Sequence, residues 1–409
     1  MAKKIPIGVD DFSELISKKN DFLFVDKTLF IKEFIDEGVK VPLIIRPRRW
    51  GKTINMSMLR YFFAPEVEGH KTKGLFDNLA IAKEDNGSYL KHQGMNPVIF
   101  ISFKDIKQIS FDLFLKNFSV IIAELYTENR KELLDSDEIS KEEKDYYLSI
   151  IKRESDQIEL ENSLKFLSRC LYKHTKQKTL ILIDEYDTPL NTAYINGYFE
   201  EAVHFFKSLL GSALKGNNAI EKGIMTGILR LSKNSMLSDL NNLKLYSLMD
   251  DKYSQFFGFS ENEVRMLFSE SEVPLDLPSV QKWYNGYRSG HLTDIHNPWS
   301  ILNCIDDKGA LKDYWIKTGG ETLLNNIFIE SGPSVKENLN LLISGASIES
   351  VIDDYVSFDQ MKEGGKEEVL WSLLWALGYF KTTGETTQSG TINKYHLMIQ
   401  NYEVDSSYR

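Results

Sequence analysis

The residues of this chain best suited to chemistry are Gly51, Lys52 and Thr53, which follow an apolar run and a basic turn. The stretch 41–53 reads VPLIIRPRRWGKT, and apolar residues at spacings of three and four come after it. A strand, a loop, Gly-Lys-Thr and a helix in this order are typical of a phosphate-binding loop. Backbone N–H groups of such a loop hold the phosphates, the lysine offsets their charge, and the threonine hydroxyl binds Mg²⁺. We therefore expect these three residues to bind ATP or GTP, with Thr53 as a metal ligand.

The first position of the loop departs from the usual pattern G-x-x-x-x-G-K-[ST], because Arg46 stands where the first glycine is expected. That glycine relieves backbone strain, so a strict pattern search would reject this chain. We count Arg46, Arg48, Arg49 and Trp50 among the candidates for nucleotide binding. Arg48 and Arg49 either steer or contact the phosphates or are ordinary solvated charges. Trp50 either stacks on the base or packs against the edge of the sheet, and packing is the favoured interpretation.

A second candidate site follows the apolar run 180–183, which is typical of a strand buried on both faces of a parallel sheet. Asp184 and Glu185 come at the end of this strand, where ligands bind in open α/β sheets. We expect Asp184 to hold Mg²⁺ through water and Glu185 to orient or deprotonate the attacking water. An isolated Asp-Glu pair commonly does no more than cap a core strand, but the Gly-Lys-Thr upstream favours the catalytic interpretation.

Two further candidates, Thr226 and Arg230, flank the end of the next expected strand, over 223–229. In related ATPases a polar residue at this place senses the γ-phosphate. An arginine there can also stabilise the charge that develops in the transition state. The alternative for both residues is a turn with a surface arginine. Asp187 is interpreted as an acid at the N-terminus of a helix rather than as a catalyst.

The composition narrows the class of protein. A chain of 409 residues exceeds the size at which one core usually stops growing, so two or three domains are expected. The net charge of −10 argues against a nucleic-acid binder with a wholly basic surface, although it leaves room for a local basic patch. The two cysteines, Cys170 and Cys304, have no metal-like spacing, which fits a reducing, cytoplasmic compartment. No apolar run approaches the roughly 20 residues of a membrane helix.

Strands alternate with helical patterns as far as about residue 250, which predicts a doubly wound, mostly parallel sheet. Helices and a terminal strand beyond this point predict a helical region and a small winged-helix-like module. We expect a P-loop core over 1–255, with a charged helical insertion at about 104–178. A helical, lid-like region over 256–335 and the winged-helix-like module over 336–409 would follow.

The chain resembles the bacterial AAA-ATPase-like proteins that commonly carry a C-terminal PD-(D/E)xK nuclease-like domain. Several motifs carry this resemblance in the right order, from about residue 5 to residue 400, and in that family the first glycine of the loop is also arginine. The resemblance implies a P-loop NTPase of the additional-strand class and favours ATP over GTP. The motifs are IPIGVDDF (5–12), FVDKT (24–28), RPRRWGKT (46–53), IDEYDTP (183–189), TGILRLS (226–232), WYNGY (283–287) and NPWS (297–300).

The nuclease part of the resemblance is not carried over. Family members with a nuclease continue well beyond a strand like 395–400, whereas this sequence ends at Arg409. The nearest match to a nuclease motif, Glu363 with Lys366, has the wrong spacing and stands in a polar Gly-Gly segment. We expect no nuclease activity from these residues.

The sequence thus predicts a cytoplasmic, Mg²⁺-dependent AAA-like ATPase in which Lys52 offsets phosphate charge and Glu185 activates water. One alternative is a nucleotide-gated switch or scaffold that turns over little and acts through a protein partner at the charged segment 135–161. A homo-oligomer is also possible, and assembly into a ring would require Arg230 or another arginine to reach a neighbour's nucleotide. Another alternative is a DNA-processing factor that has lost its nuclease and contacts DNA through 260–409, which the acidic balance does not support.

Overall fold

The computed structural model describes residues 3–230, 241–318, 332–356, 360, 367–389 and 392–408. The chain groups into two compact units, which we describe separately. The sheet unit comprises 28–44 and 55–245, and the C-terminal unit comprises 1–27, 45–54 and 246–409. Glu363, Lys366 and the end of the motif at 226–232 lie outside the described residues.

A five-stranded sheet in the order β4-β5-β6-β1-β7 is the centre of the sheet unit. β4 pairs with β5 and β5 with β6 in parallel, with Val98 opposite Leu180 and Leu180 opposite Lys222. Every residue of β1 and β5 is buried, as the apolar runs predicted. The strands are β1 (Val41–Ile45), β4 (Val98–Ser102), β5 (Thr179–Asp184), β6 (Ile220–Gly227) and β7 (Leu243–Tyr246).

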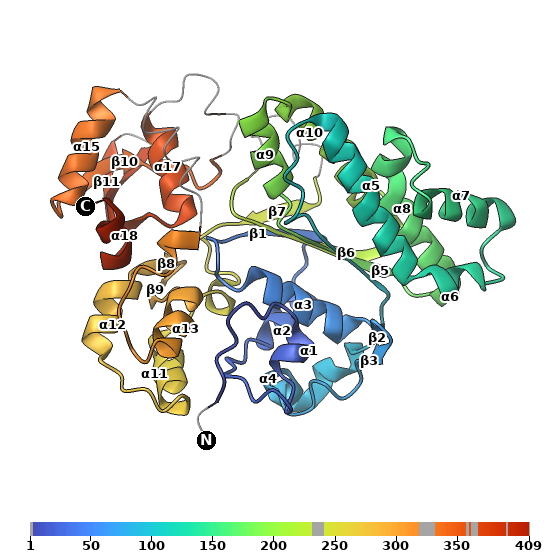
Figure 1. The fold of residues 1–409 in the computed structure, drawn as a ribbon, viewed down its shortest axis with the longest axis horizontal. Helices are drawn as coiled ribbons and strands as arrows, with labels where there is room; N and C mark the ends of the chain where they lie inside the picture. The colour runs from blue at the N-terminus through green and yellow to red at the C-terminus, as the bar shows by residue number, and fades with distance from the viewer. Residues whose placement is uncertain are drawn as a thin grey trace. The chain divides into compact units, whose positions relative to one another are not determined.

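Helices cover both faces of this sheet, which is why β1 and β5 are apolar without alternation. Figure 1 shows α2 and α3 on one face and α9 and α10 on the other. The predicted α/β fold with a mostly parallel sheet is therefore confirmed. The helices are α2 (Leu29–Asp36), α3 (Lys52–Phe63), α9 (Thr188–Asn196) and α10 (Phe199–Leu214). Smaller elements of this unit are β2 (Glu66–Val67), β3 (His70–Lys71), α4 (Ala80–Lys83) and the 3₁₀ segment η1 (Glu84–His92).

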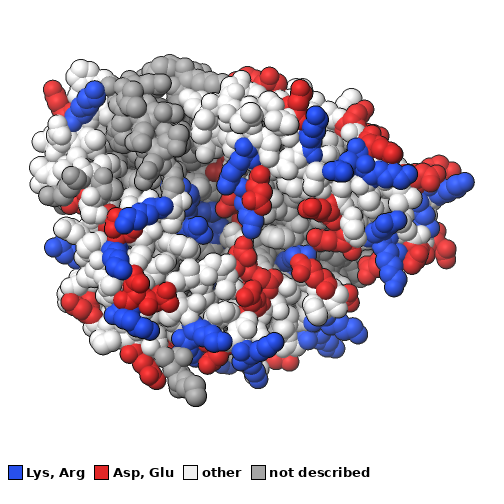
Figure 2. Space-filling view, in the orientation of Figure 1, with Lys and Arg blue, Asp and Glu red and all other residues white. Residues whose placement is uncertain are grey.

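The charged segment between β4 and β5 is helical, as predicted. Ser140 and Asp156 each begin a helix with a capping box, which fixes where α7 and α8 start. Its charges pair across the segment, Lys173 with Glu143 and Lys176 with Glu138. On the face in Figure 2, both signs lie side by side over α6 and α7. The helices are α5 (Phe111–Glu128), α6 (Arg130–Leu134), α7 (Lys141–Ile151) and α8 (Gln157–Thr175).

The C-terminal unit contains a small helical core. Leu23 from the N-terminal segment packs into this core with Val264, Tyr284 and Ile301. Asn297 caps α13 by accepting hydrogen bonds from the N–H groups of residues 299 and 300, as its position before proline predicted. The elements are α1 (Phe12–Leu15), η2 (Ser254–Phe256), α11 (Glu261–Glu270), α12 (Leu277–Tyr284), β8 (Tyr287–Ser289), β9 (Leu292–Ile295), α13 (Pro298–Asp306) and η3 (Ile316–Thr318).

The last part of the C-terminal unit is a three-stranded antiparallel sheet in the order β10-β12-β11 with helices around it. The chain order of helix, strand, helix, strand and strand agrees with the predicted helical and winged-helix-like region. In the described part of the chain, no helix is long and apolar enough to cross a membrane. The elements are α15 (Pro333–Ile343), β10 (Ile348–Val351), α17 (Glu367–Leu377), β11 (Phe380–Ser389), β12 (Ile392–Ile399) and α18 (Tyr402–Tyr408).

Candidate functional site

The loop between β1 and α3 has the backbone of a tight phosphate-binding turn. Gly51 has φ of +81° and Arg49 has φ of +64°, both in the left-handed region. A Cβ at Gly51 would meet only Ile54 Cγ2 at 3.6 Å, so the backbone angle rather than crowding requires glycine there. α3 starts at Lys52, directly after this turn. The first N–H groups of a helix have no partner within it, which makes this end suitable for an anion.

Lys52 lies inside the loop rather than in solvent. Its side chain is buried, and Nζ donates to the carbonyl oxygens of Arg46 at 3.0 Å and Pro47 at 2.8 Å. The loop is therefore wrapped around the ammonium group, which places a positive charge at the start of the helix. Thr53, the predicted metal ligand, is half-buried in the first turn of α3.

Arg46, at the position of the missing glycine, is fully buried. Its Nη1 donates to the carbonyl oxygens of Ile45 at 2.7 Å, Tyr246 at 3.1 Å and Ser247 at 2.7 Å. Burial lowers the pKa of Arg46 to about 10, and nearby Asp250 opposes this shift, so the group stays charged at neutral pH. The structure turns this guanidinium toward backbone carbonyl groups, and we interpret Arg46 as holding the start of the loop.

The two other arginines of the loop contact different aromatic side chains. Exposed Arg49 lies over the Trp299 ring at 4.2 Å, a cation–π contact. Arg48 Nη2 donates to the Tyr379 hydroxyl at 3.3 Å, and the Arg48 carbonyl accepts from Trp315 Nε1 at 3.2 Å. Both arginines are thus engaged by aromatic side chains of the C-terminal unit.

Trp50 packs, as favoured from the sequence, although its partner is not a strand of the large sheet. It is wholly buried and meets the Tyr287 ring edge-on at 5.0 Å between ring centres. Its carbonyl accepts from the Gly258 N–H at 3.4 Å. The partners of the loop's outer residues are spread over more than 100 residues of sequence, so no local pattern could have revealed them.

The carboxylates at the end of β5 have distinct surroundings. Asp184 is fully buried, and its Oδ1 accepts from the Thr226 hydroxyl at 2.5 Å. Glu185 is half-buried and has φ of +51°, a strained angle for a residue other than glycine. Its Oε2 accepts from the Thr188 hydroxyl at 3.2 Å. The structure brings Thr226 to Asp184, so two of the predicted site residues are direct partners.

The next two residues of the motif hold the segment that follows β6. The Tyr186 hydroxyl donates to the Leu229 carbonyl at 2.7 Å. Asp187 Oδ2 accepts from the N–H groups of Ile228 at 2.8 Å and Leu229 at 2.9 Å. A Cβ at Gly227 would lie 2.5 Å from the Tyr186 ring, so only glycine fits there. Asp187 stands at the N-cap position of α9 but makes no side-chain cap hydrogen bond; its carboxylate instead fixes the segment that leads to half-buried Arg230.

The model of the AAA-ATPase-like family, described as "Predicted AAA-ATPase", matches residues 6–237. The chain belongs to this AAA-ATPase-like family. Nucleotide binding is implied by that membership.

Two comparisons extend over most of the chain. An uncharacterized protein in the vnfD 5′ region of Azotobacter chroococcum mcd 1 is 27% identical over 410 residues, which is 99% of this chain and 69% of that protein. The structure of Drosophila ORC bound to AT-rich DNA and Cdc6 aligns with 93% of this chain and 90% of its own, at 6% identity and a TM-score of 0.22.

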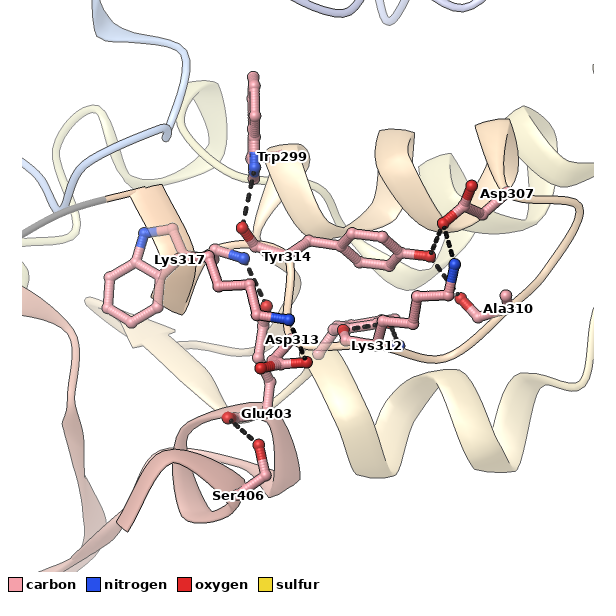
Figure 3. A network of polar contacts seen from close by, with 11 residues as sticks. Trp299, Asp307, Ala310, Lys312, Asp313, Tyr314, Lys317, Glu403 and Ser406 are labelled. Carbon is pink, nitrogen blue, oxygen red and sulfur yellow. Dashed lines mark hydrogen bonds and ion pairs between the residues drawn. The ribbon is translucent and has the colours of Figure 1, made fainter.

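In this AAA-ATPase-like protein a polar network surrounds Trp315, whose indole donates to the Arg48 carbonyl of the phosphate-binding loop. Figure 3 shows the Trp299 indole donating to the Tyr314 carbonyl, at 3.2 Å, and the Tyr314 hydroxyl donating to Asp307, at 2.8 Å. These bonds fix the segment that carries Trp315, whose indole donates to the loop. Trp299 belongs to the motif at 297–300, whereas nothing in the sequence marked Asp307, Tyr314 or Trp315 as its partners.

Glu403 is the buried charge of this network. It accepts hydrogen bonds from the Trp315 N–H at 2.5 Å and the Ser300 hydroxyl at 2.8 Å, and it is wholly inaccessible to solvent. Burial raises the pKa of Glu403 from 4.5 to about 7, against the lowering effect of those hydrogen bonds. The carboxylate therefore titrates near neutral pH. It contacts Trp315, whose indole in turn donates to the Arg48 carbonyl of the loop.

This pKa shift predicts a pH-dependent stability. A carboxyl whose folded pKa is raised stabilises fully below its unfolded pKa, and that contribution disappears as the pH rises through about 7. The size is roughly 3 kcal/mol. Glu403→Gln should be more stable than wild type at pH 8 and should show a flatter stability profile between pH 4.5 and pH 7 in urea unfolding. Exposed Glu337→Gln is the control and should leave the profile unchanged; an identical slope in both variants would remove Glu403 as its source.

Proposed function

We propose that this chain binds Mg·ATP at the loop after β1 and hydrolyses it with the carboxylates at the end of β5. The observation that carries the proposal is the buried Lys52 ammonium, enclosed by a left-handed turn at the start of α3. A cation held at a helix N-terminus suits a polyphosphate. β1 and β5 belong to one sheet with β6 between them, and ligands bind at the carboxyl ends of such strands.

The available donor groups fit Mg²⁺ as the metal. Mg²⁺ takes oxygen ligands and commonly uses one or two protein groups, with water and substrate phosphates as the others. The Thr53 hydroxyl and the Asp184 carboxylate are such groups, and Thr226 donates to one Asp184 oxygen, which fixes the direction of the other. When bound, the ion would offset negative charge on the β- and γ-phosphates.

The remaining residues then have separate tasks in water attack on the γ-phosphorus. Lys52 offsets phosphate charge, and Glu185 orients the water and accepts its proton while the bond to the β–γ bridging oxygen breaks. Arg230 is the candidate for stabilising charge on the departing group, because Tyr186 and Asp187 fix the segment before it. ATP is preferred to GTP on family resemblance.

Lys52→Ala tests the proposal most directly. Loss of a hydrogen bond to a charged group is worth about 1.5–3 kcal/mol, so the affinity for ATP should fall by about 10- to 150-fold. Calorimetric titration of ATP into the wild type and the variant measures this, with phosphate release followed with Mg²⁺ and with chelator. Exposed Lys116→Ala on α5 is the matched control. Unchanged ATP affinity in Lys52→Ala would place the nucleotide elsewhere, and tight binding without turnover in the wild type would favour a switch.

A further inference from the structure

The C-terminal unit contains a pocket that the proposed nucleotide chemistry does not use. Its volume is about 150 Å³. One wall is the hairpin strand β8 and another is the antiparallel sheet, elements that lie near each other in Figure 1. The residues that matter to its chemistry are Tyr287, Arg288, Trp375, Phe380, Lys381 and Gln400.

Two positive charges face this pocket without a negative partner. Among the described residues, neither Arg288 nor Lys381 forms an ion pair, and no acidic residue lines the pocket. Desolvation lowers the pKa of Lys381 and the charge of Asp294 raises it, the first effect being larger. The Asp294 carboxylate is itself engaged, accepting from Asn285 Nδ2 at 3.0 Å. An anion in the pocket would therefore meet two cations that form no ion pair among the described residues.

An unsatisfied polar group points to the same place. Gln400 is 1% exposed, lines the pocket, and its Nε2 has no hydrogen-bond partner in the described structure. A Cβ built at Gly286 would lie 3.0 Å from Lys381 Nζ and 3.3 Å from Gln400 Nε2, so these donors meet around one point. Buried donors are satisfied in most proteins, so this amide is available to donate to an occupant of the pocket.

We propose that this pocket binds a small organic anion, with its carboxylate or phosphate on Arg288, Lys381 and Gln400 and its apolar body against Trp375 and Phe380. Arginine and lysine together are the usual recognition groups for such oxyanions. A cavity of about 150 Å³ accommodates a single benzene ring, which limits the apolar body to that size.

Two residues that line the pocket also lie next to the phosphate loop of the same unit. Tyr287 lines the pocket and packs edge-on against Trp50. Gly378 also lines it, and a Cβ there would lie 3.3 Å from Pro47 Cβ. An occupant would thus touch residues that hold the loop, whether or not the chain hydrolyses ATP.

Calorimetric titration of the full chain with phenyl phosphate, benzoate and inorganic phosphate tests the proposal without nucleotide. We expect saturable binding of phenyl phosphate or benzoate, with affinity reduced at least 10-fold in Lys381→Met and in Arg288→Gln and unchanged in exposed Lys336→Met. The far-ultraviolet spectrum of each variant checks folding, and removal of the half-buried Lys381, which forms no ion pair among the described residues, should not lower stability.

Three outcomes would overturn the assignment. Binding of no probe, or equal binding in the wild type and both pocket variants, would remove the pocket as an anion site. Equal affinity for inorganic phosphate and phenyl phosphate would show that the aromatic wall takes no part, which contradicts an organic ligand.

Discussion

Glu185→Gln should reduce ATP turnover by about 10²- to 10⁴-fold while leaving ATP affinity nearly unchanged. An amide has the shape of the carboxylate and its oxygen can still accept from the Thr188 hydroxyl, as Glu185 does at 3.2 Å. It cannot accept a proton from the attacking water. Glutamine tolerates φ of +51° about as poorly as glutamate, so the strained backbone does not add a second effect.

Single-turnover phosphate release with enzyme in excess separates this chemical step from product release. Exposed Glu201→Gln in the first turn of α10 removes a carboxylate of the same unit and should retain wild-type turnover. Turnover at the wild-type rate in Glu185→Gln would show that another group activates the water. In that event the left-handed angle at Glu185 would serve only to direct the chain from β5 toward Tyr186.

The elements of the fold that could be predicted from sequence are those whose signal is local. β5 is a run of apolar residues because helices cover both sides of the sheet, and this run marks the strand and the position of Asp184 after it. The cap at Asn297 is equally local, since its oxygen binds N–H groups only two and three residues ahead. Gly51 is fixed by its own backbone angle, which is why Gly-Lys-Thr is visible as a motif.

Several features of the site depend instead on contacts between distant segments. Asp187 was interpreted as an acid at a helix start, but its carboxylate binds N–H groups some 41 and 42 residues away. The partner of Trp50, Tyr287, and that of the Arg48 carbonyl, Trp315, are farther still. Spacing within one segment carries no information about which remote backbone a side chain will meet, so these roles required the structure.

Arg46→Gly, which restores the glycine of the usual motif, should destabilise the protein by roughly 3–5 kcal/mol. The substitution deletes a fully buried side chain and leaves the carbonyl oxygens of Tyr246 and Ser247 without their guanidinium donor. Each buried acceptor left unpaired costs about 1–3 kcal/mol, and the remaining cavity adds to this. Desolvation of the guanidinium, which lowers its pKa to about 10, opposes this loss.

Urea unfolding of Arg46→Gly, Arg46→Met and exposed Arg153→Gly distinguishes the contributions. Arg153 has φ of +61°, so glycine there should cause no loss of stability. Methionine at position 46 fills most of the volume without donating hydrogen bonds, so it should fall between the wild type and the glycine variant. A stability of Arg46→Gly within 1 kcal/mol of the wild type would mean that burial of the charge cancels its hydrogen bonds. The shape of the loop would then depend on Gly51 and on the carbonyl groups around Lys52. Arginine at the first position would be a tolerated substitution rather than a residue that holds the loop in place.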